Sequence, residues 1–223
     1  YEISACLVGS EMCIRDRAAT DLTTIVGQTS ATINATAATI LTGTAAEVVA
    51  AINHGQVNHD ANFLVTLTAD STAAAADLKT INTATSGIIT ATGVATITGS
   101  ASDVTDVLAV ETSQGNAGQQ IDLDTNFTGT ISDTVTVSAL TLTNIDDDTP
   151  GIVTVTETVT LTGTAAQIRL AAQRDSNDTL RLATAFGATI YEGSVAATAL
   201  TTIVRPSTAT ITATSETKLT GTE

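Results

Sequence analysis

Apolar and threonine residues alternate with a period of two in several short segments of the chain. In residues 152–161 the apolar side chains fall on one face and the threonines on the other: Val153, Val155, Val159 and Leu161 against Thr154, Thr156, Thr158 and Thr160. Residues 63–67 and 208–214 alternate in the same way. Because Thr is β-branched and suits an exposed strand face, the pattern predicts β-strands with one buried face.

A helical period follows three short turns. Thr44-Ala-Ala-Glu47 and Thr164-Ala-Ala-Gln167 fit a capping box, and Ser100-Ala-Ser-Asp103 is a weaker version of it. The apolar residues that follow align at helical spacing: Val48, Ala51 and Ile52; Val104, Val107 and Leu108; Ile168, Ala171 and Ala172. Gly55 and Gly115 are predicted stops for the first two helices. Helices of about ten residues are marginal alone, so these need a sheet to pack on.

The predicted elements recur as a tandem repeat. Leu-x-x-Ile segments begin at four positions: Leu22, Leu78, Leu142 and Leu200. Nineteen residues after each of them an LTGT or ITGS anchor begins, at Leu41, Ile97, Leu161 and Leu219. Units of roughly sixty residues therefore begin near residues 21, 77, 141 and 199, and each holds two strand–helix pairs.

This organisation predicts the fold class. A strand and a helix every thirty residues or so favour successive crossovers between parallel strands. We expect a β-rich α/β repeat solenoid in which short helices pack on parallel strands; an all-β solenoid with the Ala-rich segments as loops is the alternative. The equivalent positions of the repeat should be buried: Ile25, Ile81, Ile145 and Ile203, and Val48, Val104 and Ile168.

Composition agrees with a thin, repeated core. Aromatic residues are only 2% of the chain, so it lacks the bulk for one thick core, although 43% of its residues are hydrophobic. The net charge is −15 with eight Lys and Arg, which argues against nucleic acid and anionic lipid as partners. No apolar stretch approaches the roughly 18 residues of a membrane-spanning helix, so membrane insertion is not expected.

Residues 1–17 differ from everything that follows. They hold both cysteines, Cys6 and Cys13, and the only methionine. The run CLVGSEMCIRDR, residues 6–17, resembles the translation of a transposase-end adapter used to prepare sequencing libraries. We therefore expect residues 1–17 to be an artefact outside the fold and residues 18–223 to be a repeat array truncated at both ends. Neither a disulfide nor a thiol site is predicted from these cysteines.

Few residues suggest chemistry. His54 and His59 have no further ligand at a suitable spacing and are predicted to decorate a loop. Residues 146–148 form the densest carboxylate cluster, with Asp122 and Asp124 nearby in sequence. A solvated acidic turn is the first interpretation, and a weak Ca²⁺ site is the alternative. No catalytic, cofactor-binding or metal-binding residue is assigned, and the chain is predicted not to be an enzyme.

The units DLTTIVGQTSATINATAATILTGTAAEVVAAI and DLKTINTATSGIITATGVATITGSASDVTDVL resemble the Thr/Ala-rich β-strand repeats of very large secreted proteins of cyanobacteria and other aquatic bacteria. The resemblance covers residues 18–223 and implies long cell-surface or adhesin stalks exported by type I secretion. We therefore expect a spacer array in an extracellular bacterial surface protein, whose coils contact neighbouring repeats. A repeat module that binds a cell-surface glycan or protein, and a phage fibre segment, are the alternatives.

Overall fold

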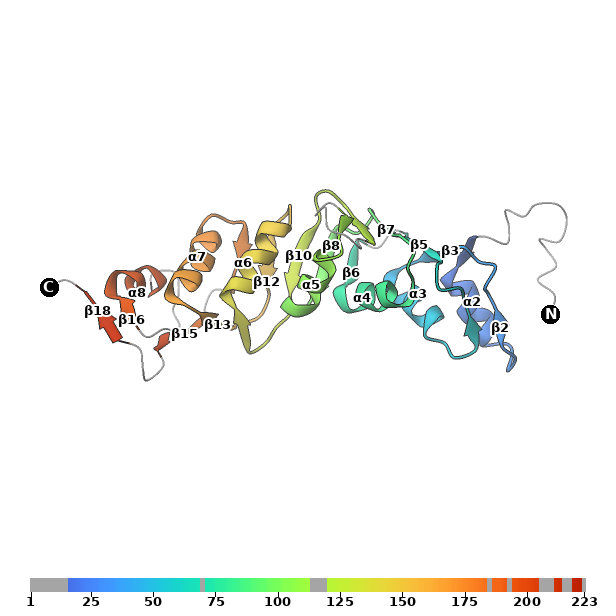
Figure 1. Cartoon of the computed structure of the whole chain (residues 1–223), viewed down its shortest axis with the longest axis horizontal. Coiled ribbons are helices and arrows are strands. Elements are labelled where there is room, and N and C mark those ends of the chain that lie inside the picture. Colours follow the sequence, from blue (N-terminus) through green and yellow to red (C-terminus); the bar gives the residue numbers. More distant parts are fainter. Residues whose placement is uncertain are drawn as a thin grey trace. The chain divides into compact units, whose positions relative to one another are not determined.

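The computed structural model describes residues 16–68, 71–112, 120–183, 186–191, 194–204, 211–213 and 218–221. By its internal contacts the chain divides into two compact units, residues 1–95 with 109–125 and residues 96–108 with 126–223. Both units have an α/β fold with parallel sheets (Figure 1), and the described residues contain seven helices. The Ala-rich segments are helical, so the all-β alternative is wrong.

The first unit is built on a parallel sheet whose strands adjoin in the order β1-β3-β5-β7-β9. Their bounds are β1 (Asp16–Ala18), β3 (Ile40–Gly43), β5 (Leu64–Leu67), β7 (Ile89–Ala91) and β9 (Ile121–Leu123). Two short strands, β2 (Ile33–Asn34) and β4 (Val57–Asn58), pair beside it, and β6 (Thr72–Ala74) leads into the last helix. Helix α2 (Ala19–Val26) packs against α3 (Ala45–Ile52), and α3 packs against α4 (Ala75–Ala84).

The second unit repeats this arrangement. Strands β8 (Thr96–Gly99), β10 (Thr128–Ile131), β12 (Val153–Val155) and β14 (Leu180–Arg181) adjoin in that order. A second sheet holds β11 (Thr136–Ser138), β13 (Thr160–Gly163), β15 (Gly187–Ile190) and β17 (Ile211–Ala213), and β16 (Ser194–Ala196) pairs with β18 (Lys218–Thr220). The helices α5 (Ala101–Leu108), α6 (Ala139–Asp148), α7 (Ala165–Ser176) and α8 (Ala197–Val204) each pack against the next.

Strand register shows how the chain advances. In the first unit Ile40 pairs with Leu64, and in the second unit Gly129 pairs with Val153, in both cases 24 residues further along the chain. Longer steps of 32 residues link Ile89 to Ile121. We call the stretch from a strand to its next neighbour in the same sheet a coil. The predicted unit of about sixty residues thus contains two coils.

The predicted core columns are confirmed with one exception. Ile81, Val48, Val104, Ile168 and Ile203 have no exposed surface, and Ile145 is 1% exposed. Ile25 was predicted to be buried and is only half-buried, so that prediction is wrong. The three buried isoleucines lie on α4, α6 and α8, which follow α3, α5 and α7 and pack against them. Among the described residues no helix precedes α2, so this face of Ile25 stays uncovered.

One predicted strand is two strands. The alternating segment 152–161 forms β12 and β13, which belong to different sheets, with a bend at Glu157 between them. Its alternation holds on both sides of the bend, since Val153, Val155, Val159 and Leu161 are all buried. Residues 63–67 behave as predicted, because Phe63, Val65 and Leu67 are buried in and beside β5. Of the segment 208–214, only Ile211–Ala213 lies within the described residues, as β17.

The boundary at residue 17 needs a correction. We expected the segment up to Arg17 to lie outside the fold, but Asp16 and Arg17 belong to β1 and pair with Ile40 and Leu41 of β3. Strand pairing uses backbone groups, which any sequence supplies, so an exposed sheet edge can accept residues of foreign origin. Residues 1–15, including Cys6 and Cys13, lie outside the described residues.

Arg17 occupies a position that the rest of the array gives to aliphatic residues. It stands two residues before its helix, as do Ala73, Val137 and Val195, which are 2–4% exposed. Replacing Arg17 with Val should therefore raise the free energy of unfolding by about 1 kcal/mol, because a half-buried cation gives way to apolar surface. Denaturant titration measures this, with Asp16→Val, an exposed change in the same strand, as the control. A less stable Arg17→Val variant would contradict the alignment.

The predicted capping boxes are present. The Thr44 and Thr164 hydroxyls accept hydrogen bonds from the backbone N–H groups of Glu47 and Gln167, whose side chains accept from the cap residues in return. The weaker version differs, because the Asp103 carboxylate accepts from the Ser100 hydroxyl. At the other end, α3 stops at Ile52, three residues before Gly55, while Gly115 lies outside the described residues.

The glycine of the LTGT anchor has a conformational role. Gly43 and Gly163 adopt φ angles of 152° and 153°, a region that side chains with a Cβ rarely enter. A Cβ on Gly163 would lie 2.8 Å from Gln167 Oε1, the acceptor that completes the capping box. The anchor is therefore a turn that passes the chain from a strand into a capped helix.

Replacing Gly163 with Ala should lower the free energy of unfolding by about 2 kcal/mol, since it strains the backbone and displaces Gln167. Gly55→Ala is the matched control, because its added methyl group would meet no atom within 4 Å. Thermal or chemical denaturation of the two variants measures the difference. Equal stabilities would show that the anchor tolerates a side chain.

Candidate functional site

The carboxylate cluster predicted from the sequence lies at the end of α6. Asp146, Asp147 and Asp148 are the last three residues of that helix, and no basic residue stands in its last turn. The C-terminus of a helix carries the negative end of its dipole, so three carboxylates there are unfavourable without a cation nearby.

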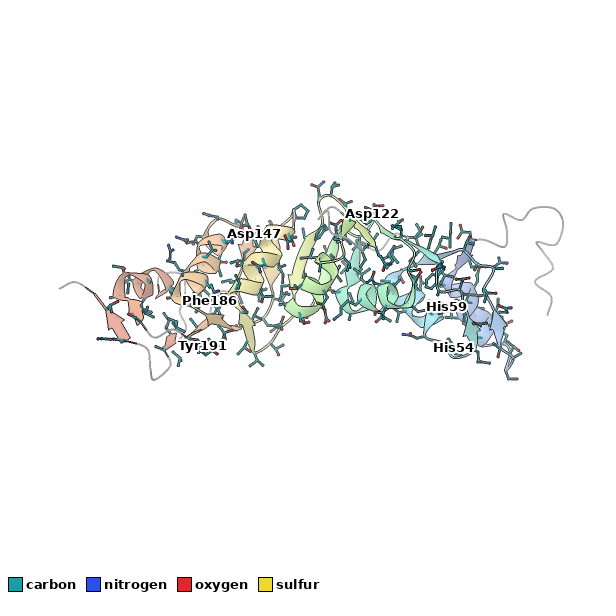
Figure 2. The ribbon with its side chains drawn as sticks, in the orientation of Figure 1. His54, His59, Asp122, Asp147, Phe186 and Tyr191 are labelled. Atoms are coloured by element: carbon teal, nitrogen blue, oxygen red, sulfur yellow. The ribbon has the colours of Figure 1, made fainter. Side chains whose placement is uncertain are left out.

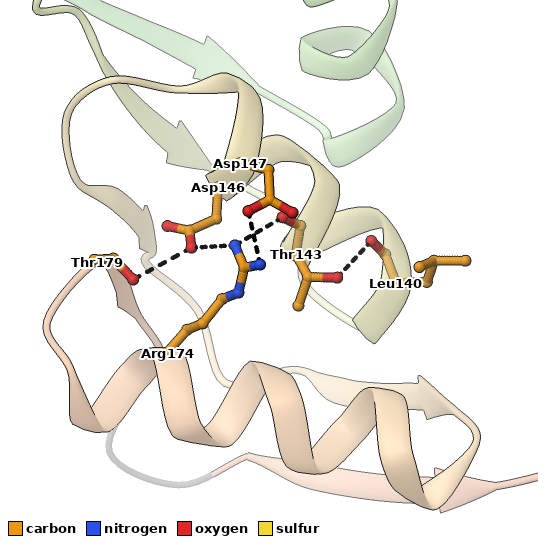
Figure 3. A network of polar contacts seen from close by, with 6 residues as sticks. All are labelled: Leu140, Thr143, Asp146, Asp147, Arg174 and Thr179. Atoms are coloured by element: carbon orange, nitrogen blue, oxygen red, sulfur yellow. Dashed lines mark hydrogen bonds and ion pairs between the residues drawn. The ribbon is translucent and has the colours of Figure 1, made fainter.

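Arg174 of α7 supplies that cation (Figure 3). Its Nη1 donates to Asp146 Oδ2 at 2.6 Å and to the Thr143 carbonyl at 3.0 Å. Its Nη2 lies 2.7 Å from Asp147 Oδ1. Asp146 Oδ2 also accepts from the Thr179 hydroxyl at 3.2 Å. One guanidinium thus joins the last turns of two neighbouring helices, and we call this group the Arg174 network.

Burial makes Asp146 the sensitive member of the network. Its side chain is 4% exposed, against 19% for Arg174 and 61% for Asp147. Asp146 Oδ1 is buried and accepts no hydrogen bond within the described structure. Partial desolvation lowers the pKa of Arg174, but the hydrogen bonds to Asp146 and Asp147 outweigh it, and the pKa lies above its ordinary value. The charge on Asp146 therefore depends mainly on Arg174.

This geometry favours a structural role for the cluster over the Ca²⁺ alternative. Arg174 already supplies positive charge to two of the carboxylates. In the part of the chain that the structure describes, no three His, Cys, Asp or Glu side chains come together in an arrangement able to hold a metal ion. Asp122, in the other unit, accepts from the Thr112 hydroxyl at 3.3 Å.

The histidines lie where the sequence places them, in the loop after α3 (Figure 2). His54 Nδ1 accepts from the backbone N–H of Gln56 at 3.3 Å. His59 Nδ1 lies 2.9 Å from the Asp60 carbonyl, and its ring packs edge-on against Phe63 with 5.0 Å between ring centres. These contacts hold the loop and its strand in place.

Comparison with protein-family models, curated protein sequences and solved structures gave no match. The site must therefore be argued from its own residues. No helix in the described ranges is both long enough and apolar enough to span a membrane.

Threonine ladders line the outward faces of the sheets. Thr42, Thr66 and Thr90 stand in register across β3, β5 and β7 of the first unit. In the second unit Thr98, Thr130 and Thr154 are aligned in the same way. Adjacent strands place such hydroxyls about 4.8 Å apart. The ladders form regular, uncharged, partly exposed surfaces.

Aromatic rings contribute little to these surfaces. Phe63, Phe127 and Phe186 are each at most 3% exposed and belong to the core. Tyr191, which is 58% exposed, is the one exposed aromatic side chain among the described residues (Figure 2). Sugar-binding surfaces commonly use aromatic faces as platforms, and the ladders lack them.

Sequence reasoning missed Arg174 as the partner of the acidic cluster. A signal for it existed, because successive helices of a parallel array should place their last turns side by side. Arg174 is the basic residue in the last turn of α7, next to the acidic last turn of α6. Matching opposite charges between the ends of consecutive helices would have paired them.

Proposed function

We propose that the chain is a solenoid segment that acts as a spacer in an extracellular or cell-surface bacterial protein. The observation that carries the proposal is the parallel register, in which equivalent residues of successive coils become neighbours. Such coils extend by addition, and each contacts mainly the coils before and after it. That property suits a part whose task is length.

Three further observations support a spacer. The coils are built from the same small set of residues, whereas an active site needs a set that is not repeated. The Arg174 network joins two helices of the array to one another. The net charge of −15 favours solubility and opposes non-specific association.

Force spectroscopy on the whole chain tests the proposal. If coils are the cooperative units, stretching should release the chain in several steps that correspond to one or two coils. A coil of 24 residues adds about 80 Å of extended chain. Release of the whole length in one event would contradict a coil-by-coil spacer.

The threonine ladders favour a second candidate, a module that binds a glycan or a protein through its sheet faces. A glycan array probed with the wild-type chain and a Thr66→Val, Thr90→Val variant separates the two candidates. Saturable binding that the variant loses would favour the binding module. Absence of retained glycan, or equal retention by both proteins, would favour the spacer.

A further inference from the structure

The α2 end of the first unit contains a groove of about 280 Å³. Its apolar lining includes Leu22 and Ile25 of α2 and Ile33 and Ala38 from the segment that follows. Asp21 also lines it and is exposed. The groove is thus an apolar surface with one carboxylate beside it.

The sequence of α2 identifies what covers the same surface elsewhere in the chain. Helix α2 reads ATDLTTIV and α8 reads ATALTTIV, so the two differ only at Asp21 and Ala199. Ile203 of α8 has no exposed surface, whereas its equivalent Ile25 is half-buried. Helix α7 packs against α8, and no described helix takes that place beside α2. The groove therefore lies where a helix like α7 would pack.

The opposite face of these helices behaves in the opposite way. Leu22 of α2 is 4% exposed, while its equivalent Leu200 of α8 is half-buried. In the interior helix α4 both positions, Leu78 and Ile81, are fully buried. The isoleucine face is thus the one covered by the preceding helix, and the contact recurs in α3–α4, α5–α6 and α7–α8.

Charge distinguishes α7 from the other two covering helices. Helix α3 carries Glu47 and no basic residue, and α5 carries Asp103 and Asp106 and no basic residue. Helix α7 carries Arg169 and Arg174. Because Asp21 lines the groove, a basic helix complements it better than an acidic one.

We propose that the groove beside α2 is a docking site for a basic amphipathic helix of the α7 type, supplied by another polypeptide. The occupant presents small and aliphatic residues at the positions of Ile168, Ala171 and Ala172, all buried in α7, and a cation toward Asp21. This proposal goes beyond the spacer role, since it needs only the equivalence of α2 and α8. A helix bound there would extend the chain's own helix–helix interface across a molecular boundary.

The test is binding of a synthetic peptide with the sequence of residues 163–177 to the full chain. A hydrocarbon link between positions 166 and 170, both exposed in α7, holds the peptide helical. Saturable binding is expected by calorimetry or fluorescence anisotropy. An Ile168→Asp peptide should bind at least tenfold more weakly, as should the wild-type peptide to an Ile25→Asp protein.

Two protein variants guard against misleading results. Asp21→Lys changes an exposed residue, should leave folding intact, and is expected to weaken binding several-fold. Leu64→Asp changes an exposed residue outside the groove and should leave binding unchanged. No saturable binding up to about 1 mM, or equal binding of the Ile168→Asp peptide, overturns the proposal.

A third outcome names another occupant. Binding that appears only after residues 1–15 are removed would assign the groove to the chain's own N-terminal segment and would also overturn the proposal. The stepwise release expected in the stretching experiment does not depend on any of these results, so failure here leaves the spacer role separately testable.

Discussion

Replacing Arg174 with Ala should lower the free energy of unfolding by about 3 kcal/mol. The change leaves Asp146, 4% exposed, without its cation and with only the Thr179 hydroxyl as a hydrogen-bond donor. Removing one partner of a buried ion pair costs roughly 3–5 kcal/mol, and the lower end applies because the guanidinium is partly exposed. Urea titration followed by circular dichroism measures the loss.

Arg181→Ala is the matched control for this prediction. Arg181 pairs with Asp178 through two hydrogen bonds, which lower the pKa of Asp178, but both side chains are more than half exposed. Solvent screens such a pair, so its loss should change stability little. Equal effects of the two substitutions would show that Asp146 does not depend on Arg174.

The chain itself suggests a rescue for Arg174→Ala. Sixty-four residues before Asp146 and Arg174 stand Asn82 and Val110, so the preceding pair of coils has an amide and an aliphatic residue at these positions. A double variant, Asp146→Asn with Arg174→Val, removes the buried charge together with its partner. It should recover much of the stability lost in Arg174→Ala. No recovery would assign the loss to packing of the arginine stem.

Replacing Ile81 with Ala should lower the free energy of unfolding by about 2–5 kcal/mol, the usual cost of truncating a buried isoleucine. Ile81 has no exposed surface and lies on α4, which packs against α3. The substitution leaves a cavity in a thin core that has few side chains able to close it. Chemical denaturation of the full chain gives the value.

Ile88→Ala is the control, because Ile88 is the same residue type and is 45% exposed. Its loss should change stability by less than about 0.5 kcal/mol. If Ile81→Ala proved as mild as Ile88→Ala, the buried isoleucine column would not form the core of the array.

Local patterns predicted the elements well because each is written within about ten residues. The capping boxes at Thr44 and Thr164 involve residues three apart, and the isoleucine column follows from the spacing to the anchor. The bend at Glu157 was not visible, since the alternation of valines continues through it. Periodicity describes which side chains face inward and does not report a change of sheet.

Contacts between coils were harder to predict. Arg174 meets Asp146 across 28 residues, a separation set by the loops that join the strands and not by either helix alone. The half-burial of Ile25 likewise depends on what packs beside α2, which its own sequence does not encode. Such features need the register of the parallel strands, which the structure provides.

The most direct test of the stacked-coil account is an in-phase deletion of residues 75–138. It removes two coils and joins Ala74 to Ala139, so that Leu142 and Ile145 take the places of Leu78 and Ile81. The removed stretch includes fully buried residues such as Ile81, Ile89 and Ile97, whose loss would empty a single shared core.

Circular dichroism with thermal melting gives the outcome, and deletion of residues 75–126 is the control, because it joins Ala74 to Phe127 out of phase. Stacked coils predict that the in-phase variant keeps its structure per residue and melts cooperatively at a somewhat lower temperature, while the out-of-phase variant loses its structure. An in-phase variant as unfolded as the out-of-phase control would contradict the account.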